Sequence, residues 1–389
     1  MKIRSLGLHS LSIPFKVSFR HSSAERTATQ SVLAIAETES GELGLGEGCP
    51  REYVTGEDVD SCMRLFAAWE TELIGEINTL ADLERWNRER ENQIDENPAA
   101  WCAIELALLD VLAKESSQSV ESAMGLPELT GPFQYSAVLG DSSVETLEAQ
   151  VHQYVGLGFT NFKVKVSGDP AIDNRKFAIV TGAAPEARIR LDANNLWRDA
   201  DAALSYLESI ECKLFAMEEP LPAMEFDGLL QIARARSLPI ILDESFLNRS
   251  HFTHISKEPE AFIINLRISK MGGLVRSLQI ASEAAEKSIP LIVGAQVGET
   301  SILTRAAMTV GNAAGDHVLA REGAFGTLLL ERDIVEKPLT FGSMGRLDVS
   351  QLLDRNVHGW QMNYDLQNIR SAGSEDLHSL QLPPDSGRL

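Results

Sequence analysis

The sequence has few of the residues that mark several large classes of protein. Its 389 residues include four cysteines, none in a paired or Cys-x-x-Cys spacing: Cys49, Cys62, Cys102 and Cys212. This argues against a disulfide framework and indicates free thiols in a reducing cytoplasm. No apolar run approaches the ~18 residues of a membrane span. The start, MKIRSLGLHS, lacks a signal-peptide pattern, so we expect a cytoplasmic protein with no membrane partner.

Positive charge is also scarce. There are 35 lysines and arginines against 56 aspartates and glutamates, which gives a formal net charge of −21 at pH 7. Because nucleic acids and anionic lipid surfaces repel so acidic a chain, we expect neither as a partner. Apolar residues, by contrast, make up 44% of the chain and can form a large core. The length suits a barrel of roughly 250 residues plus a second domain.

The patterns along the chain change twice. Residues 1–130 begin with alternating strands and a turn at SGELGLGEG, and then become helical, most clearly in PAAWCAIELALLDVLAKES. Strands followed by helices, without alternation, predict a separate α+β domain. From QYSAVLG at 134–140 strand and helix patterns alternate, which predicts a (β/α) barrel over residues 131–344. We expect the segment of about 345–389 to complete the first domain.

Within the alternating segment, charged residues recur at an interval of about 26 residues: Lys163 and Lys165, Asp192, Glu218, Asp243 and Lys270. One strand, one helix and two short loops of a (β/α) barrel occupy about this length. Each residue stands where an apolar run ends, in FKVKV, ARIRLDAN, LFAMEEP, LPIILDES and FIINLRISK. We therefore expect all of them on the C-terminal rim of the barrel, where barrel enzymes keep their chemistry.

The three acids predict a metal site. Adjacent strands lie about 4.8 Å apart, so side chains from three neighbouring strand ends can converge. Ionised carboxylates in one place repel each other, and a divalent cation removes that conflict. All-oxygen ligation suits Mg²⁺, with Mn²⁺ as the alternative, whereas zinc is disfavoured because no His or Cys falls on these positions. The alternative that the acids are helix N-caps suits Asp192 and Asp243 singly, but Glu218 poorly.

The lysines predict proton transfer. Lys163 and Lys165 share one face of their strand, and neither face of a barrel strand suits a lysine without carboxylate partners. If QYSAVL is strand 1, they lie on strand 2 and Lys270 ends strand 6, on the opposite side of an eight-stranded barrel. A carboxylate substrate on the metal then has an amine on each side of its α-carbon. We expect Lys163 to tune the base Lys165, and Glu244 to pair with Lys270; the alternative for Lys270 is a surface lysine at a helix start.

In order and spacing, FKVKV, LDANN, EEP, LDES and NLRISKMGG resemble the motifs of the enolase superfamily, and are most similar to its muconate-lactonising subgroup. The resemblance implies a modified TIM barrel of the (β/α)7β type with an α+β capping domain. It also implies Mg²⁺ on Asp192, Glu218 and Asp243, with Lys165 and Lys270 as the acid/base pair. The side chains that would support the metal ligands are Asn194, Glu219 and Glu244. A mandelate-racemase-type site would carry a His–Asp pair late in the barrel, where this chain has Lys270.

The substrate contacts are less defined. In this superfamily two capping-domain loops close the pocket, and the resemblance places them at residues 15–28 and 49–57. The candidate contacts there and on the barrel rim are Arg20, His21, Arg51, Tyr53, Glu299 and Glu322. The arginines could clamp a distal anionic group or be solvated loop residues. Dipeptide epimerases typically carry an Asp-x-Asp after strand 8, which AREGAFGTLLLERDI lacks; its FGTLLL is similar to the FGPLLL of muconate cycloisomerases.

The resulting hypothesis is a Mg²⁺-dependent isomerase that removes the proton α to a substrate carboxylate and stabilises the enediolate on the metal, as a cycloisomerase, epimerase or racemase. An o-succinylbenzoate-synthase-like syn-dehydratase is one alternative, with Lys165 as base and Lys270 only stabilising the enolate. A non-catalytic barrel that binds a ligand is another. We expect a small-molecule carboxylate as partner and a homo-oligomeric protein.

Overall fold

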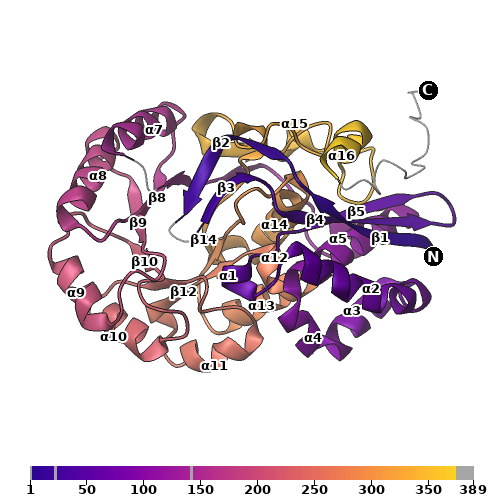
Figure 1. The fold of residues 1–389 in the computed structure, drawn as a ribbon, viewed down its shortest axis with the longest axis horizontal. Coiled ribbons are helices and arrows are strands. Elements are labelled where there is room, and N and C mark those ends of the chain that lie inside the picture. The colour runs from indigo at the N-terminus through magenta and orange to yellow at the C-terminus, as the bar shows by residue number, and fades with distance from the viewer. Residues whose placement is uncertain (1, 22–23, 141–142, 374–389) are drawn as a thin grey trace.

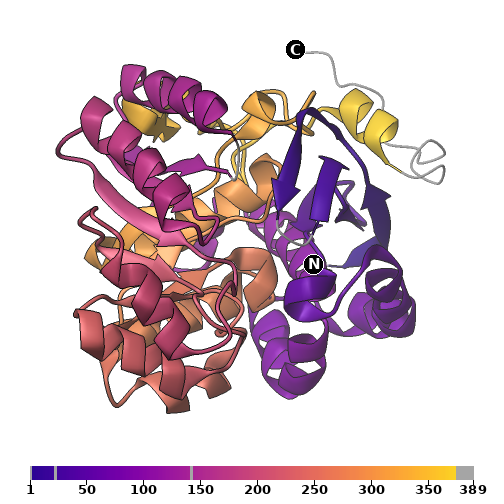
Figure 2. The same ribbon diagram turned by 60° about the vertical axis from the view of Figure 1, so that its left-hand side comes forward.

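The computed structural model of the chain describes residues 2–21, 24–140 and 143–373; for 17–21 and 24–25 it describes the backbone alone. Figure 1 shows the N-terminal strands and helices packed beside a ring of strands and helices from the middle of the chain, and Figure 2 shows the same two parts from another side. The predicted fold is confirmed: a curled sheet of eight parallel strands with helices outside it, and a strand-rich cap.

The cap contains an antiparallel sheet in the order β1-β4-β5 and a separate β2-β3 hairpin. Its strands are β1 (Ile3–Leu11), β2 (Pro14–His21), β3 (Ala24–Ala28), β4 (Ser31–Thr38) and β5 (Leu43–Gly48). Its helices are α1 (Glu52–Thr55), α2 (Val59–Glu76), α3 (Leu80–Glu89), α4 (Glu91–Glu96), α5 (Pro98–Glu115) and α6 (Val120–Ala123). Helix α5 is buried on all sides over residues 98–113, as its almost uninterrupted apolar sequence predicts.

Three glycines of β5 let α5 lie directly on the sheet. Because they alternate along the strand, Gly44, Gly46 and Gly48 share one face. A Cβ atom at each would stand about 2 Å from a backbone oxygen of α5, at Ala107, Ala103 and Ala99 respectively. These three alanines are one helical turn apart, so the glycine spacing of the strand matches the pitch of the helix.

The barrel strands run parallel in sequence order: β7 (Ala137–Leu139), β8 (Asn161–Lys165), β9 (Arg188–Asp192), β10 (Ala216–Glu218), β11 (Ile240–Leu242), β12 (Phe262–Leu266), β13 (Leu291–Val293) and β14 (Val318–Arg321). The backbone N–H of Ser136 donates to the carbonyl of Arg321 at 2.8 Å, which joins the two edges of the sheet. Inside, Ala216, Ile241, Ile263, Ile292 and Ala320 from five successive strands form one buried layer. The interior is therefore filled, and chemistry is confined to the rim.

Helices connect the strands on the outside, and β14 has no barrel helix after it among the described residues, in agreement with a (β/α)7β barrel. They are α7 (Val144–Gly156), α8 (Pro170–Ala183), α9 (Ala200–Glu208), α10 (Phe226–Arg236), α11 (Phe252–Ile255), α12 (Ile268–Met271), α13 (Leu274–Glu286) and α14 (Ser301–Ala314). Short 3-10 turns are η1 (Arg249–His251), η2 (Pro259–Ala261), η3 (Gly315–His317), η4 (Gly326–Leu328) and η5 (Ser343–Gly345). No helix in the described ranges is long and apolar enough to cross a membrane.

The C-terminal segment returns to the cap. Strand β15 (Arg346–Asp348) pairs with β6 (Pro132–Gln134), and α15 (Val349–Leu352) and α16 (Leu366–Ala372) follow. The buried Trp360 donates its backbone N–H to Asp110 at 3.0 Å and its indole N–H to the Leu106 carbonyl at 3.3 Å, both on α5. We propose on this basis to keep the division into a cap of residues 1–130 completed by about 345–389, of which 374–389 lie outside the described residues, and a barrel of 131–344.

Candidate active site

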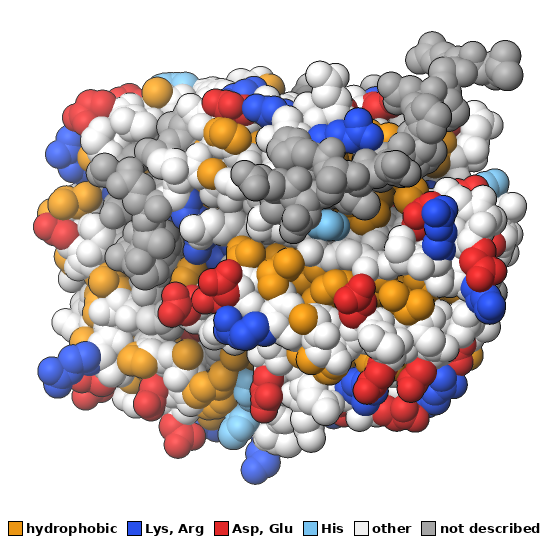
Figure 3. Space-filling model, turned by 45° about the vertical axis from the view of Figure 1, so that its right-hand side comes forward, with side chains coloured by type: hydrophobic (Ala, Val, Ile, Leu, Met, Phe, Trp, Pro, Cys, Tyr) orange, Lys and Arg blue, Asp and Glu red, His pale blue; other side chains and the backbone are white. Residues whose placement is uncertain are grey.

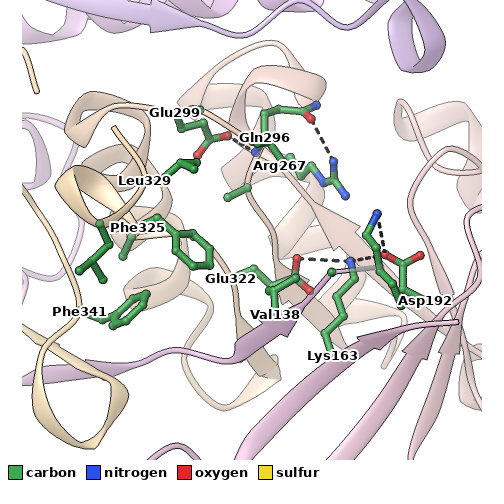
Figure 4. A pocket seen from close by; sticks show the side chains of 18 of the residues that line it. Val138, Lys163, Asp192, Arg267, Gln296, Glu299, Glu322, Phe325, Leu329 and Phe341 are labelled. Atoms are coloured by element: carbon green, nitrogen blue, oxygen red, sulfur yellow. Dashed lines mark hydrogen bonds and ion pairs between the residues drawn. The ribbon is translucent and has the colours of Figure 1, made fainter. Parts of the chain in front are cut away.

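A cavity of about 780 Å³ lies at the C-terminal ends of the barrel strands, under the cap helix α1. Figure 4 shows that one side of the cavity carries charged groups, among them Lys163, Asp192 and Arg267, and the other carries Phe325, Leu329 and Phe341. Four of the six predicted rim residues, Lys163, Lys165, Asp192 and Asp243, therefore line this cavity. On the outer face in Figure 3, acidic and basic side chains are interspersed, so the net negative charge is not gathered into one patch there.

The three predicted metal ligands end three consecutive strands. Asp192 is the last residue of β9, Glu218 the last of β10, and Asp243 follows β11 directly. Asp192 and Glu218 are partners in the β9–β10 register, and all three acids are at most 2% exposed. Buried carboxylates this close together require positive charge beside them.

Lys163 supplies part of that charge. Its ammonium lies 2.8 Å from Glu218 Oε1, 3.2 Å from Asp192 Oδ2 and 3.5 Å from Glu322 Oε2. Burial opposes ionisation, but the three carboxylates outweigh it and raise the pKa of Lys163 above its usual range. The charged form of Lys163 is therefore favoured among these three carboxylates.

Lys165 has the opposite character. Its ammonium donates to Asn194 Oδ1 at 2.7 Å, lies 3.9 Å from Asp192 Oδ2, and lines the cavity. Burial lowers the pKa of Lys165, and the neighbouring charge of Lys163 lowers it further against the pull of Asp192. That Lys163 tunes the base Lys165 stays a prediction, and this electrostatic difference is consistent with it.

Lys270 lies in the one-turn helix α12, four residues beyond β12, instead of ending the strand as predicted. Its ammonium donates to the Asp243 carbonyl at 2.7 Å, to Asp243 Oδ1 at 2.9 Å and to the Asn265 carbonyl at 2.8 Å. The predicted ion pair with Glu244 is thus wrong, because Asp243 occupies the ammonium. Burial lowers the pKa of Lys270, although Asp243 opposes the shift. Unlike Lys165, Lys270 is not among the described residues that line the cavity.

Arg267 is a site residue that the sequence-based prediction missed. Its guanidinium bonds Asp243, lies 3.9 Å from Glu218, and donates to Gln296 Oε1 at 3.0 Å. Burial alone would raise the pKa of Asp243, yet Arg267 and Lys270 lower it to about 2. A signal was present: Arg267 follows β12 directly, as Asp243 follows β11.

The residues predicted to support the ligands shape the strand ends. Glu219 accepts the backbone N–H groups of Asp243 and Ser245, both at 2.7 Å, and so fixes the turn after β11. Asn194 binds Lys165 through its side chain, as above, and its backbone N–H donates to Asp192 Oδ1 at 3.2 Å. Glu244 lines the cavity, and burial, followed by the charge of Asp243, raises the pKa of its carboxyl to about 7.

The carboxylate oxygens of the three acids are suitable ligands for a hard divalent cation, but in this structure the acids are paired with positively charged side chains. Within the described part of the chain, no three His, Cys, Asp or Glu side chains stand close enough together to hold one ion. Lys163 and Arg267 lie against the acids instead. However, Glu218 Oε2 and Glu244 Oε2 are buried and have no hydrogen-bond partner among the described residues. Burial and the neighbouring acids raise the pKa of Glu218 to about 8 in spite of Lys163. Carboxylate oxygens without partners are the ligands that Mg²⁺ prefers.

Two acids on the last strands also line the cavity. Glu322 follows β14 and accepts from Arg190 Nη2 at 2.6 Å; although burial opposes it, Lys163 and Arg190 lower the pKa of Glu322 to about 2. Glu299 accepts the Gln296 N–H at 2.5 Å, and burial raises the pKa of its carboxyl to about 8. Glu322 is therefore ionised and paired, and Glu299 is largely protonated at neutral pH.

Arg51 holds the cap to the barrel. It is 1% exposed, and its guanidinium donates to the carbonyls of Gln30 at 3.1 Å, Pro50 at 2.6 Å and Val297 at 2.6 Å. Arg51 is absent from the described lining of the cavity, so the structure gives it a role in joining two loops.

Of the other predicted cap contacts, Tyr53 lines the cavity and is 40% exposed. The side chains of Arg20 and His21 lie outside the described residues. Their placement on β2, beside the β3 strand of the hairpin, is described for the backbone alone.

Comparison with known proteins agrees with the fold. The family model described as "Enolase C-terminal domain-like" matches residues 146–352, slightly more than half of the chain. A curated N-succinyl-L-Arg/Lys racemase from Bacillus cereus is 26% identical over 312 residues, covering 80% of this chain and 84% of the racemase. The crystal structure of N-succinyl Arg/Lys racemase from Bacillus cereus aligns with a TM-score of 0.84 at 23% identity, over 96% of this chain and 98% of that one.

A second relative is the L-Lys-D/L-Arg epimerase of Methylococcus capsulatus, which is 30% identical over 335 residues, covering 82% of this chain and 91% of the epimerase. A dipeptide epimerase structure from Methylococcus capsulatus, complexed with Mg and the dipeptide L-Arg-D-Lys, aligns with a TM-score of 0.79 at 26% identity, over 94% of this chain and all of that one. Both similarities extend over the cap as well as the barrel.

Proposed function

This chain is an enzyme of the enolase superfamily, in its mandelate racemase/muconate lactonizing branch, and from that premise we propose that it is a Mg²⁺-dependent epimerase or racemase of a carboxylate. The proposed reaction inverts the carbon next to the carboxylate of an amino-acid derivative. The similarity of the chain to epimerases and racemases favours this reaction over the cycloisomerase and dehydratase alternatives. The observation that carries the proposal is the buried lysine on each side of the three acids, at Lys165 and Lys270.

The acids Asp192, Glu218 and Asp243 would hold the metal. Mg²⁺, or Mn²⁺ in its place, would polarise the substrate carboxylate and so stabilise the negative charge that develops when the α-proton leaves. A related dipeptide epimerase structure contains Mg and a dipeptide, which supports the assignment. Asn194, Glu219 and Glu244 then support the metal ligands without binding the metal themselves. Glu219 does so through the turn that carries Asp243.

The two lysines move the proton. Lys165, whose pKa burial lowers, takes the α-proton at its Nζ from one face of the carbon, while Asn194 orients the amine. Lys270 delivers a proton at its Nζ to the other face, and gives up one of its bonds to Asp243 or Asn265 as it does so. Lys163 remains charged and keeps the acids in place.

Deuterium exchange at the α-carbon tests this mechanism. In D₂O the wild-type protein with Mg²⁺ should exchange the α-proton of both enantiomers of an N-acyl amino acid or of a dipeptide, followed by NMR. Lys165→Met and Lys270→Met should each slow epimerisation about a thousandfold or more. Each variant should still exchange the α-proton of one enantiomer only. Lys213→Met, which removes an exposed lysine, is the control and should behave as the wild type.

Exchange of a single enantiomer in the wild type, lost in Lys165→Met, would indicate a one-base reaction such as that of the dehydratase instead. Full activity of either lysine variant would remove that lysine from the mechanism.

The proposal also includes a cytoplasmic homo-oligomer. Sedimentation velocity of the purified protein tests the oligomeric state. Substrate contacts by Arg20, His21, Tyr53, Glu299 and Glu322 belong to the proposal as well.

A further inference from the structure

Part of the cavity lining away from the acids is apolar. Tyr154, Phe325, Leu329 and Phe341 form it, and we call these four residues the apolar wall; Gln150 and Gln153, on α7 like Tyr154, also line the cavity. Figure 4 shows Phe325, Leu329 and Phe341 facing the charged group across the cavity, with Glu322 between the two sides. A substrate whose carboxylate and α-carbon lie at the charged side can therefore extend its remaining atoms along this wall.

Further aromatic contacts make the wall rigid. Phe325 and Phe341 pack edge to face with ring centroids 5.4 Å apart, and Phe341 packs on Phe159 at 5.1 Å. Tyr154 packs on the same Phe159 at 5.0 Å. Edge-to-face pairs at these distances are favourable beyond the area they bury. The surface is thus a preformed binding wall and not a gap left between loops.

The mouth of the cavity exposes two further apolar side chains. Tyr53, on cap helix α1, is 40% exposed, and Leu328, on the turn η4, is 50% exposed; both line the cavity. One comes from the cap and one from the barrel. Exposed apolar area at a binding cavity is recovered when a ligand covers it, which favours a ligand with an apolar part.

Two carboxylates close to the wall, Glu322 and Glu299, already have partners inside the protein, which makes them poor sites for a substrate ammonium group. Glu322 is held by Arg190 at 2.6 Å and by Lys163 at 3.5 Å. Glu299 accepts a backbone N–H, and its raised pKa of about 8 leaves it mostly neutral near pH 7. After β14 the chain continues with Gly323, Ala324 and Phe325, which bring no further charge.

We propose that the substrate carries a large, uncharged apolar group, aromatic or branched aliphatic, and an acylated nitrogen in place of a free ammonium. An N-acylated apolar amino acid is the simplest compound of this class. Its carboxylate would lie at the charged side, and its apolar group against Phe325 and Phe341. This inference rests on the proposed epimerase function and specifies its substrate.

Two matched comparisons of exchange rates in D₂O test the substrate class. N-acetyl-L-phenylalanine should be exchanged with a kcat/KM about tenfold or more above that of N-acetyl-L-glutamate, because the wall offers the glutamate carboxylate no positively charged partner. N-acetyl-L-alanyl-L-phenylalanine should likewise exceed L-alanyl-L-phenylalanine, which differs by its free ammonium. Equal or reversed rates in either comparison would overturn the inference while leaving the epimerase function intact. A preference for the glutamate derivative would point to Arg20 and His21 as a clamp for a distal anion.

Variants of the wall locate the effect. Phe325→Ala should lower kcat/KM for N-acetyl-L-phenylalanine by about tenfold and change that for N-acetyl-L-alanine much less, whereas Phe325→Leu should recover most of the loss. Ile172→Ala removes an apolar side chain that is 42% exposed on α8, outside the cavity lining, and should leave the preference unchanged. An unaltered preference in Phe325→Ala, with an intact fold by circular dichroism, would overturn the assignment of the wall.

A binding measurement separates this inference from the proposed reaction. The Lys165→Met variant with Mg²⁺ should bind N-acetyl-L-phenylalanine more tightly than N-acetyl-L-glutamate in a calorimetric titration. If the wild type exchanges no compound in the set but this order of affinity holds, the epimerase function fails and the substrate class stands. Equal affinities would overturn the substrate class whatever the exchange experiment shows.

Discussion

Asp243 shows at the scale of single residues how the site balances its charges. Arg267 and Lys270 both contact its carboxylate, and Lys270 also binds its carbonyl oxygen. Glu218, one strand away, shares Arg267 and is held by Lys163 as well. A metal ion would therefore compete with the lysines and the arginine, because the carboxylate oxygens that would bind it also neutralise these side chains.

This balance predicts the effect of removing one acid. Asp243→Asn keeps the shape of the side chain but removes one negative charge from the ligand set, and should weaken Mg²⁺ binding by about tenfold or more in a calorimetric titration. Asp199→Asn, at the N-cap of α9, is the matched control and should leave the affinity unchanged. The same Mg²⁺ affinity in Asp243→Asn and in the wild type would exclude Asp243 from the metal site.

The positions of these acids could be predicted from the sequence, but their partners could not. An apolar run that ends in a charged residue locates a strand end, because a buried barrel strand requires apolar side chains. Each of the three acids lies where its run predicts. Beyond the strand the rule fails. Asn194 and Glu219 have φ angles of 46° and 38°, so the chain leaves the extended conformation and side chains no longer alternate. The partner of Lys270 likewise depends on the chain beyond its strand: Lys270 lies in α12, four residues past β12, where it contacts Asp243 and not Glu244.

At the scale of whole elements, the packing of α5 on β5 decides how the cap forms. The motif LGLGEG predicts a turn or hairpin from its composition, and the structure adds that its glycines allow helix and strand to touch. This function of the glycines depends on a helix more than fifty residues further along the chain. It could not be derived from the local pattern, in which the same glycines only weaken a strand.

Gly46→Ala should therefore destabilise the protein. The added Cβ would stand 2.1 Å from the carbonyl oxygen of Ala103, and the three nearest atoms are all backbone of α5, which cannot shift as easily as a side chain. Overpacking of this kind costs about 1–3 kcal/mol, measurable as a lower midpoint of urea unfolding. Gly75→Ala is the matched control: it lies in the exposed part of α2 with nothing near its Cβ position, and should be neutral or slightly stabilising. Equal losses in both variants would contradict the packing argument.

Across the whole molecule, buried carboxylates of the cap hold helices of the barrel. Glu47 on β5 accepts the N–H and the hydroxyl of Thr300, at the start of α14. Glu105 on α5 accepts the N–H groups of Leu274 and Val275, at the start of α13. Helix N-termini favour negative charge, so each contact anchors the cap to the barrel beside the cavity.

These anchors make stability depend on pH. Burial raises the pKa of Glu105 from 4.5 to about 7, so between these values the folded protein binds more protons than the unfolded chain. The stabilising contribution of the group is complete below its unfolded pKa and is lost as the pH rises toward 7, by at most roughly 1.4 kcal/mol per pH unit. Glu105→Gln removes this titration, so its thermal unfolding midpoint should fall less steeply than that of the wild type between about pH 5 and 7. Glu186→Gln, at an exposed position, should follow the wild type. Parallel curves for Glu105→Gln and the wild type would show that the carboxylate does not titrate in this range and that the anchor is insensitive to pH.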